Sequence, residues 1–312
     1  MLLFCAFISI LQASTPVILD TDIGDDIDDA LALSLALQSP ELNVLGIVTV
    51  LQDGNRRADL VWKILSLYHR TEIPVGVGAE QPLMAQPRTG SVRQTEALLS
   101  TDRIPADRRR NGLQLLIDTC LRSPVKITLI AYGPLTNVAI ALRAEPRLSE
   151  KLERIVLMNG VFFRPGLEYN TKIDPEASAI VYSSGVPVVT VGLDVTTQCL
   201  LSSDHLRQFA TSKLESVQFL WKLIQIWQHG NPEQRPVLHD PLAVAVTVRP
   251  ELITTARGTV AVETRGLQDR TYGMTIFRKE SGGTTQVAQE VSAAAAVDFF
   301  MSRVLAAPLN PQ

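Results

Sequence analysis

Six aspartates lie within residues 20–30, between a short apolar segment and a run of helix-forming residues. Residues 15–19 are apolar and β-branched, which predicts a buried strand. Residues 30–37 contain only Ala, Leu and Ser, which predicts a helix. One or two aspartates at such a turn would be ordinary caps of the helix N-terminus. Six exceed that need, because crowded carboxylates repel one another and resist ionisation unless a cation lies among them.

The ligand atoms that this turn offers are all oxygens, which suits a hard cation such as Ca²⁺ or Mg²⁺. The turn is not an EF-hand loop. Counted from Asp20, such a loop needs Gly at the sixth position and Glu at the twelfth, where this chain has Asp25 and Leu31. For Asp25 and Asp26 taken singly, a solvated acidic turn remains the alternative.

Predicted strands and helices alternate along most of the chain. After residues 15–19, strands are expected at 43–50, 73–77, 126–131, 154–158 and 186–191, and helices at 56–69, 109–121, 138–142, 214–228 and 242–248. This alternation predicts an α/β fold with an open, mostly parallel doubly wound sheet flanked by helices. Residues 258–263 and 270–275 predict a small antiparallel addition near the C-terminus, before a last helix over 291–305. In such sheets ligands bind at the carboxyl ends of the strands, where the aspartate turn falls.

Composition limits the protein to a few classes. The 312 residues, 46% of them hydrophobic and 20% charged, suffice for one large α/β domain or two small ones. We expect a single domain over residues 15–307 and a tail over residues 308–312. The net charge of −3 gives no electrostatic reason to expect nucleic acid as a partner. The three cysteines, Cys5, Cys120 and Cys199, are too widely spaced to indicate a disulfide framework or a zinc site.

Residues 1–14 are apolar and too few to span a bilayer as a helix. They are similar to the apolar region of a secretory signal peptide, with Ala13 and Ser14 after it. A signal would send the protein to the periplasm or out of the cell. No Lys or Arg precedes the segment, so a misassigned start or a buried first strand is the alternative, with a cytoplasmic protein. Every other apolar run is broken by charge or proline, and no membrane span is expected.

Four separated segments resemble, in order, those of the nucleoside hydrolases, the calcium-dependent ribonucleoside N-ribohydrolases that prefer inosine and uridine. The aspartate turn is similar to the signature Asp-x-Asp-Pro-Gly-x-Asp-Asp-Ala, with Ile23 in the Pro place and two extra residues before Asp28-Asp29-Ala30. The other segments are 132–137, 168–177 and 239–241. The resemblance covers residues 17–304. It implies a catalytic domain of this fold, hydrolysis of ribonucleosides to free base and ribose, and a homodimer or homotetramer.

The resemblance also implies roles for single residues. Calcium would be held by the carboxylates of Asp22, Asp29 and Asp240 and by the backbone carbonyl of Tyr132. Asp22 would also be the general base that activates a calcium-bound water. His239 would protonate the leaving base or, as the alternative, only line the base pocket.

Five residues match family positions around the ribose: Asp28, Asn55, Met158, Glu168 and Asn170. Asp26 competes with Asp28 for its role, Asn55 reads equally well as a plain turn residue, and a Met that ends a strand is more often part of the core. The aromatic residues that could stack on a base are Phe162, Phe163, Trp221 and Trp227. The stretch 78–103 lacks the His-Gly-x-Asp-Gly segment of many members, which leaves the preferred base open.

Two other functions compete with this interpretation. One is a phosphatase of the haloacid-dehalogenase type, with Asp20 as nucleophile, Asp22 as acid, and Lys126 or Lys172 as the lysine that it needs. The other is a non-catalytic protein that binds nucleosides or sugars with calcium.

Overall fold

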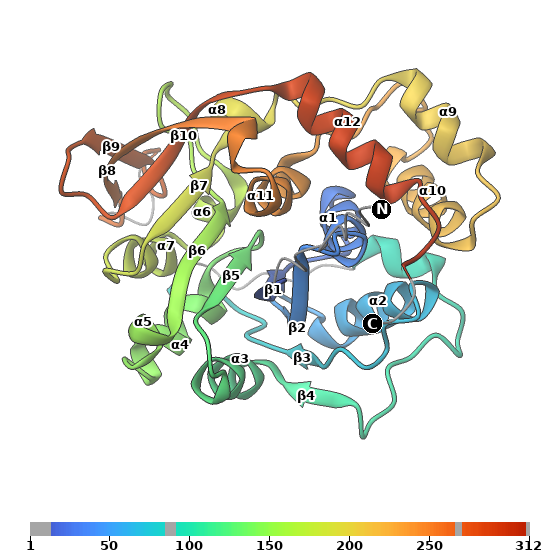
Figure 1. Cartoon of the computed structure of the whole chain (residues 1–312), viewed down its shortest axis with the longest axis horizontal. Coiled ribbons are helices and arrows are strands. Elements are labelled where there is room, and N and C mark those ends of the chain that lie inside the picture. Colours follow the sequence, from blue (N-terminus) through green and yellow to red (C-terminus); the bar gives the residue numbers. More distant parts are fainter. Residues whose placement is uncertain (1–13, 85–91, 266–269, 310–312) are drawn as a thin grey trace, which may run out of the picture.

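A single twisted sheet forms the centre of the structure, a computed structural model that describes residues 14–84, 92–265 and 270–309 (Figure 1). The expected signal segment, apart from Ser14, lies outside the described residues. The strands are β1 (Thr15–Thr21), β2 (Leu42–Thr49), β3 (Val75–Val77), β4 (Arg109–Asn111), β5 (Ile127–Ala131), β6 (Leu152–Met158), β7 (Val188–Val191), β8 (Ile253–Val262), β9 (Thr275–Lys279) and β10 (Thr285–Val291).

The sheet order is β4-β3-β2-β1-β5-β6-β7-β10-β8-β9. Neighbouring strands from β4 to β10 run parallel, whereas β8 is antiparallel to β10 and β9 is antiparallel to β8. The expected fold class, a mostly parallel doubly wound sheet with an antiparallel addition at the C-terminal side, is thereby confirmed.

Helices cover both faces of this sheet (Figure 1). They are α1 (Asp28–Leu37), α2 (Gly54–Leu67), α3 (Gly112–Arg122), α4 (Thr136–Ala144), α5 (Leu148–Lys151), α6 (Tyr169–Ile173), α7 (Pro175–Tyr182), α8 (Leu193–Thr196), α9 (Ser203–Thr211), α10 (Glu215–Gln228), α11 (His239–Val248) and α12 (Ala293–Val304), with 3₁₀ helices η1 (Arg93–Ala97) and η2 (Pro250–Leu252). One apolar core joins the sheet to α1, α2, α10, α11 and α12, and the other joins it to α3, α4, α5 and α7. Within the described ranges, none of these helices has the length and apolar character that crossing a bilayer requires.

The centre of the sheet positions the aspartate turn. β1 lies between β2 and β5. From β1 the strand order runs outward through β2, β3 and β4 on one side, and from β5 it runs outward through β6 and β7 on the other. A crevice forms at the carboxyl ends of strands where the winding reverses. The aspartate turn leaves β1 at this point and leads into α1. All residues of α1 are buried, because α11 and α12 pack against it as well as the sheet.

Three expected boundaries were wrong near the edges of the sheet. Arg109 begins the edge strand β4 rather than a helix, and α3 starts at Gly112. β9 begins at Thr275, the last residue of the range expected for it. β10 ends at Val291, where the last helix was expected to begin, and α12 starts at Ala293. β4 carries charged and polar side chains and β10 mixes polar with apolar ones, so neither shows the apolar run that marks a buried strand.

The Asp174 carboxylate joins three segments of the chain. It caps α7 through the Ala177 amide at 3.1 Å, and it also accepts from the Leu83 amide at 2.9 Å and the Thr136 hydroxyl at 2.6 Å. We expect Asp174→Ala to lower the free energy of unfolding by about 2–4 kcal/mol, because a cap is lost and the buried Thr136 hydroxyl and the partly buried Leu83 amide lose their acceptor.

The matched control is Ser202→Ala, which removes the cap of α9 and should cost about 1 kcal/mol. Chemical denaturation of both variants and the parent measures the difference. Equal losses in the two variants would contradict the linking role of Asp174.

Candidate active site

A cavity of about 550 Å³ opens at the carboxyl ends of the central strands, next to the aspartate turn. Its walls come from the turn after β1, the ends of β5 and β6, the segment around α6, and the segment from α10 to α11. The lining residues are Asp22, Asp25, Asp26, Asp28, Asp29, Tyr132, Met158, Leu167, Glu168, Tyr169, Asn170, Leu193, Trp227, His229, Gln234, His239 and Asp240.

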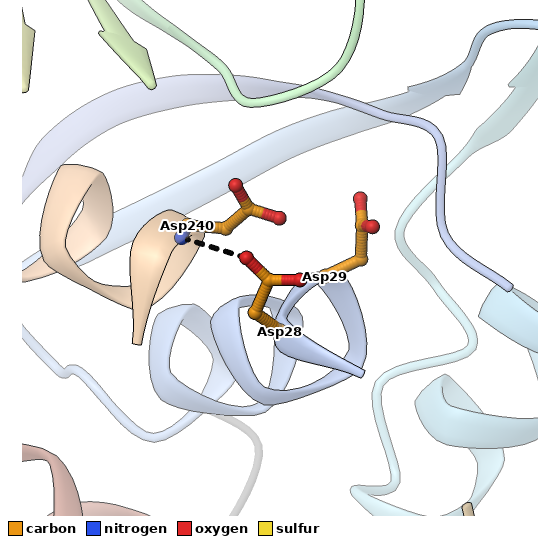
Figure 2. A group of neighbouring side chains, drawn as sticks. All are labelled: Asp28, Asp29 and Asp240. Atoms are coloured by element: carbon orange, nitrogen blue, oxygen red, sulfur yellow. Dashed lines mark hydrogen bonds between the residues drawn. The ribbon is translucent and has the colours of Figure 1, made fainter. Parts of the chain in front are cut away.

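Three buried carboxylates converge from the first turns of two helices (Figure 2). Asp28 and Asp29 open α1, Asp240 lies in the first turn of α11, and one oxygen of each lies within 4.8 Å of the others. Neither helix has a side-chain cap, since the residues before them are Ile27 and Leu238. The Asp240 amide instead donates to Asp28 Oδ2 across the two helices at 3.3 Å. The helix ends therefore face each other, with their carboxylates between them.

Asp22 lies beside this group, at the end of β1. Gly133 packs so closely against it that a Cβ there would lie 2.9 Å from both Asp22 Oδ1 and the Asp22 amide. A side chain at this position would therefore displace the carboxylate. Thr21, one residue earlier, donates from its hydroxyl to Asp29 Oδ1 at 2.6 Å and so links the strand to the first turn of α1.

The carboxyl groups of the site hold their protons unusually tightly. Burial raises the pKa of Asp22 to about 7, an effect that the nearby Arg57 opposes and Asp25 reinforces. Burial, followed by repulsion from neighbouring carboxylates, raises the pKa of Asp28, Asp29 and Asp240 well above the ordinary value. A bound cation would lower these pKa values again, because its positive charge favours the ionised carboxylates.

The donor set fits a hard divalent cation. Two unit charges about 5 Å apart repel by about 3 kcal/mol at an effective dielectric constant of about 20, so each ionised pair in the group is costly. The group has carboxylate oxygens and no sulfur or imidazole ligand, as Ca²⁺ and Mg²⁺ prefer. Asp28 belongs to the tightest group together with Asp29 and Asp240, whereas the prediction from the resemblance had Asp22 as the third carboxylate.

Asn170 orients the predicted backbone ligand. Its side-chain amide donates to the Tyr132 carbonyl at 2.9 Å and to the Met158 carbonyl at 3.1 Å. The amide thereby ties the ends of β5 and β6 together under the cavity. All three residues line the cavity, as the sequence predicted for them.

Glu168 has its carboxylate occupied by the protein chain. It accepts from the amides of Asn170 at 2.6 Å and Thr171 at 2.9 Å as the cap of α6, and from the Gly160 amide at 3.1 Å. Burial raises the pKa of Glu168, and the hydrogen bonds from these backbone amides oppose the rise. Glu168 lines the cavity, and its hydrogen bonds hold the loop 160–168 against α6.

His239 lines the cavity one residue before Asp240. Its Nδ1 is paired with the Thr196 hydroxyl at 2.7 Å, and burial lowers its pKa to about 4. The ring is therefore neutral at neutral pH. This differs from the expectation of a histidine that titrates near neutrality, because the sequence did not reveal how deeply the ring is buried.

Asn55 does not reach the cavity. It lies exposed in the first turn of α2, where its side-chain oxygen accepts from Arg109 at 2.9 Å. We leave it out of the ribose site.

Aromatic and polar residues at the cavity mouth were only partly foreseen. Of the four aromatic candidates, Trp227 lines the cavity. Phe163 packs edge-on against Phe277, with 5.8 Å between the ring centroids. Phe162 and Trp221 pack against the apolar cores. The lining residues that the sequence did not single out are Leu167, Tyr169, Leu193, His229 and Gln234. They lie in loops or at helix ends, where no periodicity identifies them.

Asp20 is fully buried behind the cavity and accepts from the Asn137 side-chain amide at 2.8 Å. Lys126 lies just before β5, at the amino end of that strand, and Lys172 is exposed. The phosphatase arrangement needs these groups together in the cavity, so the structure speaks against it.

Comparisons with known proteins agree on one family. The profile described as inosine-uridine preferring nucleoside hydrolase matches residues 17–300. The chain is 37% identical over 283 residues to the pyrimidine-specific ribonucleoside hydrolase RihA of Enterobacter sp. (strain 638), covering 84% of this chain and 87% of the relative. The RihA of Citrobacter koseri is 35% identical over 278 residues, with 84% and 87% covered.

Solved structures extend this agreement to the fold. A plant nucleoside hydrolase, the PpNRh1 enzyme, superimposes with a TM-score of 0.82 at 26% identity, covering 94% of this chain and all of the plant chain. A purine-preferring ribonucleoside hydrolase from Gardnerella vaginalis gives a TM-score of 0.81 at 27% identity, covering 93% and 98%.

The raised pKa values predict how pH affects the metal-free protein. Between pH 3.8 and about 7, folded Asp22 keeps a proton that the unfolded chain has released, so the folded state binds more protons. The free energy of unfolding of the chelated protein should therefore fall as pH rises through this window. A saturating divalent cation should remove that loss.

The measurement is thermal unfolding with chelator and with the cation between about pH 5 and pH 8. The difference between the two series cancels groups outside the site. We expect the stabilisation by the cation to grow with pH. Stabilisation that is constant or shrinks over this window would contradict the assignment of the raised pKa values to the metal site.

Proposed function

The chain belongs to the inosine-uridine preferring nucleoside hydrolase family, and we propose how its cavity cleaves the N-glycosidic bond. As a member it is a hydrolase of N-glycosyl compounds that splits ribonucleosides into base and ribose. The observation that carries the mechanism is the convergence of Asp22, Asp28, Asp29 and Asp240 on one cavity, with pKa values that burial raises.

We propose Ca²⁺ as the cation, held by the carboxylates of Asp22, Asp29 and Asp240 and by the Tyr132 carbonyl. The all-oxygen donor set and the closeness of Asp29 and Asp240 support this assignment. When bound, the cation would lower the pKa of a water molecule and help to hold the ribose hydroxyls. Asp28, in the same group, would lie at the border between the cation and the sugar.

Asp22 is the proposed general base. Its carboxylate accepts a proton as the water attacks the anomeric carbon, and the sugar passes through an oxocarbenium-like state. Its place in the cavity beside the proposed calcium ligands supports this role, because a general base must lie within hydrogen-bond reach of the water that it deprotonates.

The proposed ribose site consists of Asp28, Asn170, Glu168 and Met158. Asp28 is buried inside the cavity, whereas Asp26 is exposed at its mouth and accepts from the Ile27 amide at 2.7 Å, which favours Asp28 for the ribose hydroxyls. Asn170 uses its amide hydrogens on Tyr132 and Met158, which leaves its side-chain oxygen to accept from a hydroxyl. Glu168 would hold the sugar through an oxygen that also accepts from the chain.

His239 is proposed to assist the departure of the base. Because its ring is neutral, it would do so by donating a hydrogen bond from a ring N–H to the base as negative charge develops there. Thr196, bonded to Nδ1, would fix the ring orientation.

Pyrimidine ribonucleosides are the proposed preferred substrates. The support comes from the RihA relatives, whose names describe them as pyrimidine-specific at 35–37% identity, whereas the purine-preferring solved structure is 27% identical. The homodimer or homotetramer and the export through residues 1–14 stay predictions.

Ribose release from uridine, cytidine, inosine, adenosine and guanosine tests the function. We expect uridine and cytidine to be hydrolysed fastest, and chelation to abolish release until Ca²⁺ is restored. Release that survives complete chelation would contradict the metal assignment. Binding without release from any nucleoside would instead support the calcium-dependent binding protein.

The variant His239→Gln tests the assistance to the leaving base. We expect kcat on uridine to fall by about 10²-fold, a loss at the lower end of those typical for groups that assist proton transfer. With p-nitrophenyl riboside, whose leaving group departs as a stable anion, the loss should be within about threefold. Equal losses on both substrates would show that His239 only shapes the cavity.

A further inference from the structure

The turn that carries the site is held by side chains from two other segments. Asp22 stands at its beginning and Asp28 and Asp29 at its end, so the course of residues 23–27 sets the distance between these carboxylates. This stretch includes the two residues by which the chain exceeds the family signature. Arg57 of α2 and Gln94 of η1 contact it, and both side chains are fully buried.

Arg57 binds both ends of the first half of the turn. Its Nη1 donates to the Asp22 carbonyl and to the Ile23 carbonyl, the latter at 2.9 Å. Its Nη2 forms an ion pair with Asp25 Oδ2 at 2.7 Å, and its Nε donates to the Gln52 carbonyl at 2.9 Å. A planar guanidinium can serve these four acceptors at once, which a lysine ammonium on its flexible stem cannot do.

Gln94 binds the second half of the turn. Its backbone amide donates to the Gly24 carbonyl at 2.9 Å, and its side-chain amide donates to the Asp26 carbonyl at 2.6 Å. Val92 packs against Gly24, whose φ is +127° and where a Cβ would lie only 2.0 Å from the valine Cγ1. Gly24, the most constrained residue of the turn, is thus held by a hydrogen bond from Gln94 and by packing against Val92.

These contacts stabilise a conformation that the turn does not favour by itself. Five aspartates in eight residues, from Asp22 to Asp29, repel one another, and a left-handed glycine lies among them. Burying a guanidinium is costly unless each of its donors finds an acceptor. Three of the four acceptors of Arg57 belong to the turn, two carbonyls and the Asp25 carboxylate, so the geometry of the turn and the burial of Arg57 depend on each other.

We propose that Arg57 and Gln94 are positioning residues that hold the aspartate turn in the shape that binds the cation. They touch neither substrate nor cation; they act through the main chain of Asp22 to Asp26. The inference rests on the proposed function in that calcium occupies the site.

Charge and geometry make opposite predictions for Arg57. If Arg57 acted only as a positive charge near the site, its removal would relieve repulsion and tighten calcium binding. If it positions the turn, its removal weakens calcium binding despite the lost repulsion. Arg57→Gln separates these cases, and Arg57→Lys keeps the charge while losing the planar donor set.

Gln94→Met is the second test, because it changes no charge and removes the bond to the Asp26 carbonyl. The matched control is Arg56→Gln, which removes one positive charge from the same helix. Arg56 bonds to Asp59 at 3.4 Å and to the Thr95 carbonyl at 3.2 Å rather than to the turn.

The experiment measures calcium affinity of the full chain by titration calorimetry, then kcat and KM for uridine at saturating calcium. Thermal unfolding with calcium checks that each variant is folded. We expect calcium binding to weaken by about tenfold or more in Arg57→Lys, Arg57→Gln and Gln94→Met, as is typical when a residue that orients metal ligands is lost. We expect kcat to fall more than KM rises, and Arg56→Gln to match the parent.

Tighter calcium binding in Arg57→Gln with unchanged binding in the other two variants would overturn the proposal and leave an electrostatic role. Parent-like affinity in all folded variants would overturn it as well. Absence of calcium binding in the parent protein would instead overturn the calcium assignment, and this inference with it.

Discussion

The repulsion among buried carboxylates governs the architecture of this protein. Asp22, Asp28, Asp29 and Asp240 are withdrawn from water in one cavity, where burial and mutual repulsion raise their pKa values. Such a group is unfavourable to the folded state unless something compensates it. Helix N-termini, hydrogen-bond donors and a bound cation are the available means, and the structure around the site provides the first two.

The fold supplies this compensation through its topology. The winding reverses between β1 and β5, and the first turns of α1 and α11 line the cavity at this point. The Thr21 hydroxyl and the Asp240 amide each donate to a carboxylate of α1. Asp28 thereby takes the place of a cap for α11, which connects segments more than 200 residues apart in the sequence. The family match and the solved relatives fit this topology.

The sequence was sufficient to predict the fold class and the carboxylates that line the cavity. The contacts and the burial of other residues around the site became known only from the structure. The resemblance to the family's motifs indicated Asp28, Asp29 and Asp240 as site residues, and all three line the cavity. Asn55 could not be placed, because the sequence did not show that its side chain pairs with Arg109 on the exposed side of α2. The neutrality of His239 depends on burial, which the sequence did not show. Arg57 escaped notice because three of its four acceptors lie in the aspartate turn, which is remote from α2 in the sequence.

The most direct test of the account is the position of the cation itself. Crystals grown with a calcium salt, measured at a long wavelength, locate calcium by its anomalous scattering. We expect one strong peak in the cavity, in contact with Asp22, Asp29, Asp240 and the Tyr132 carbonyl. A cavity without a peak in crystals that bind calcium elsewhere would mean that these carboxylates are held protonated, and would contradict the central claim.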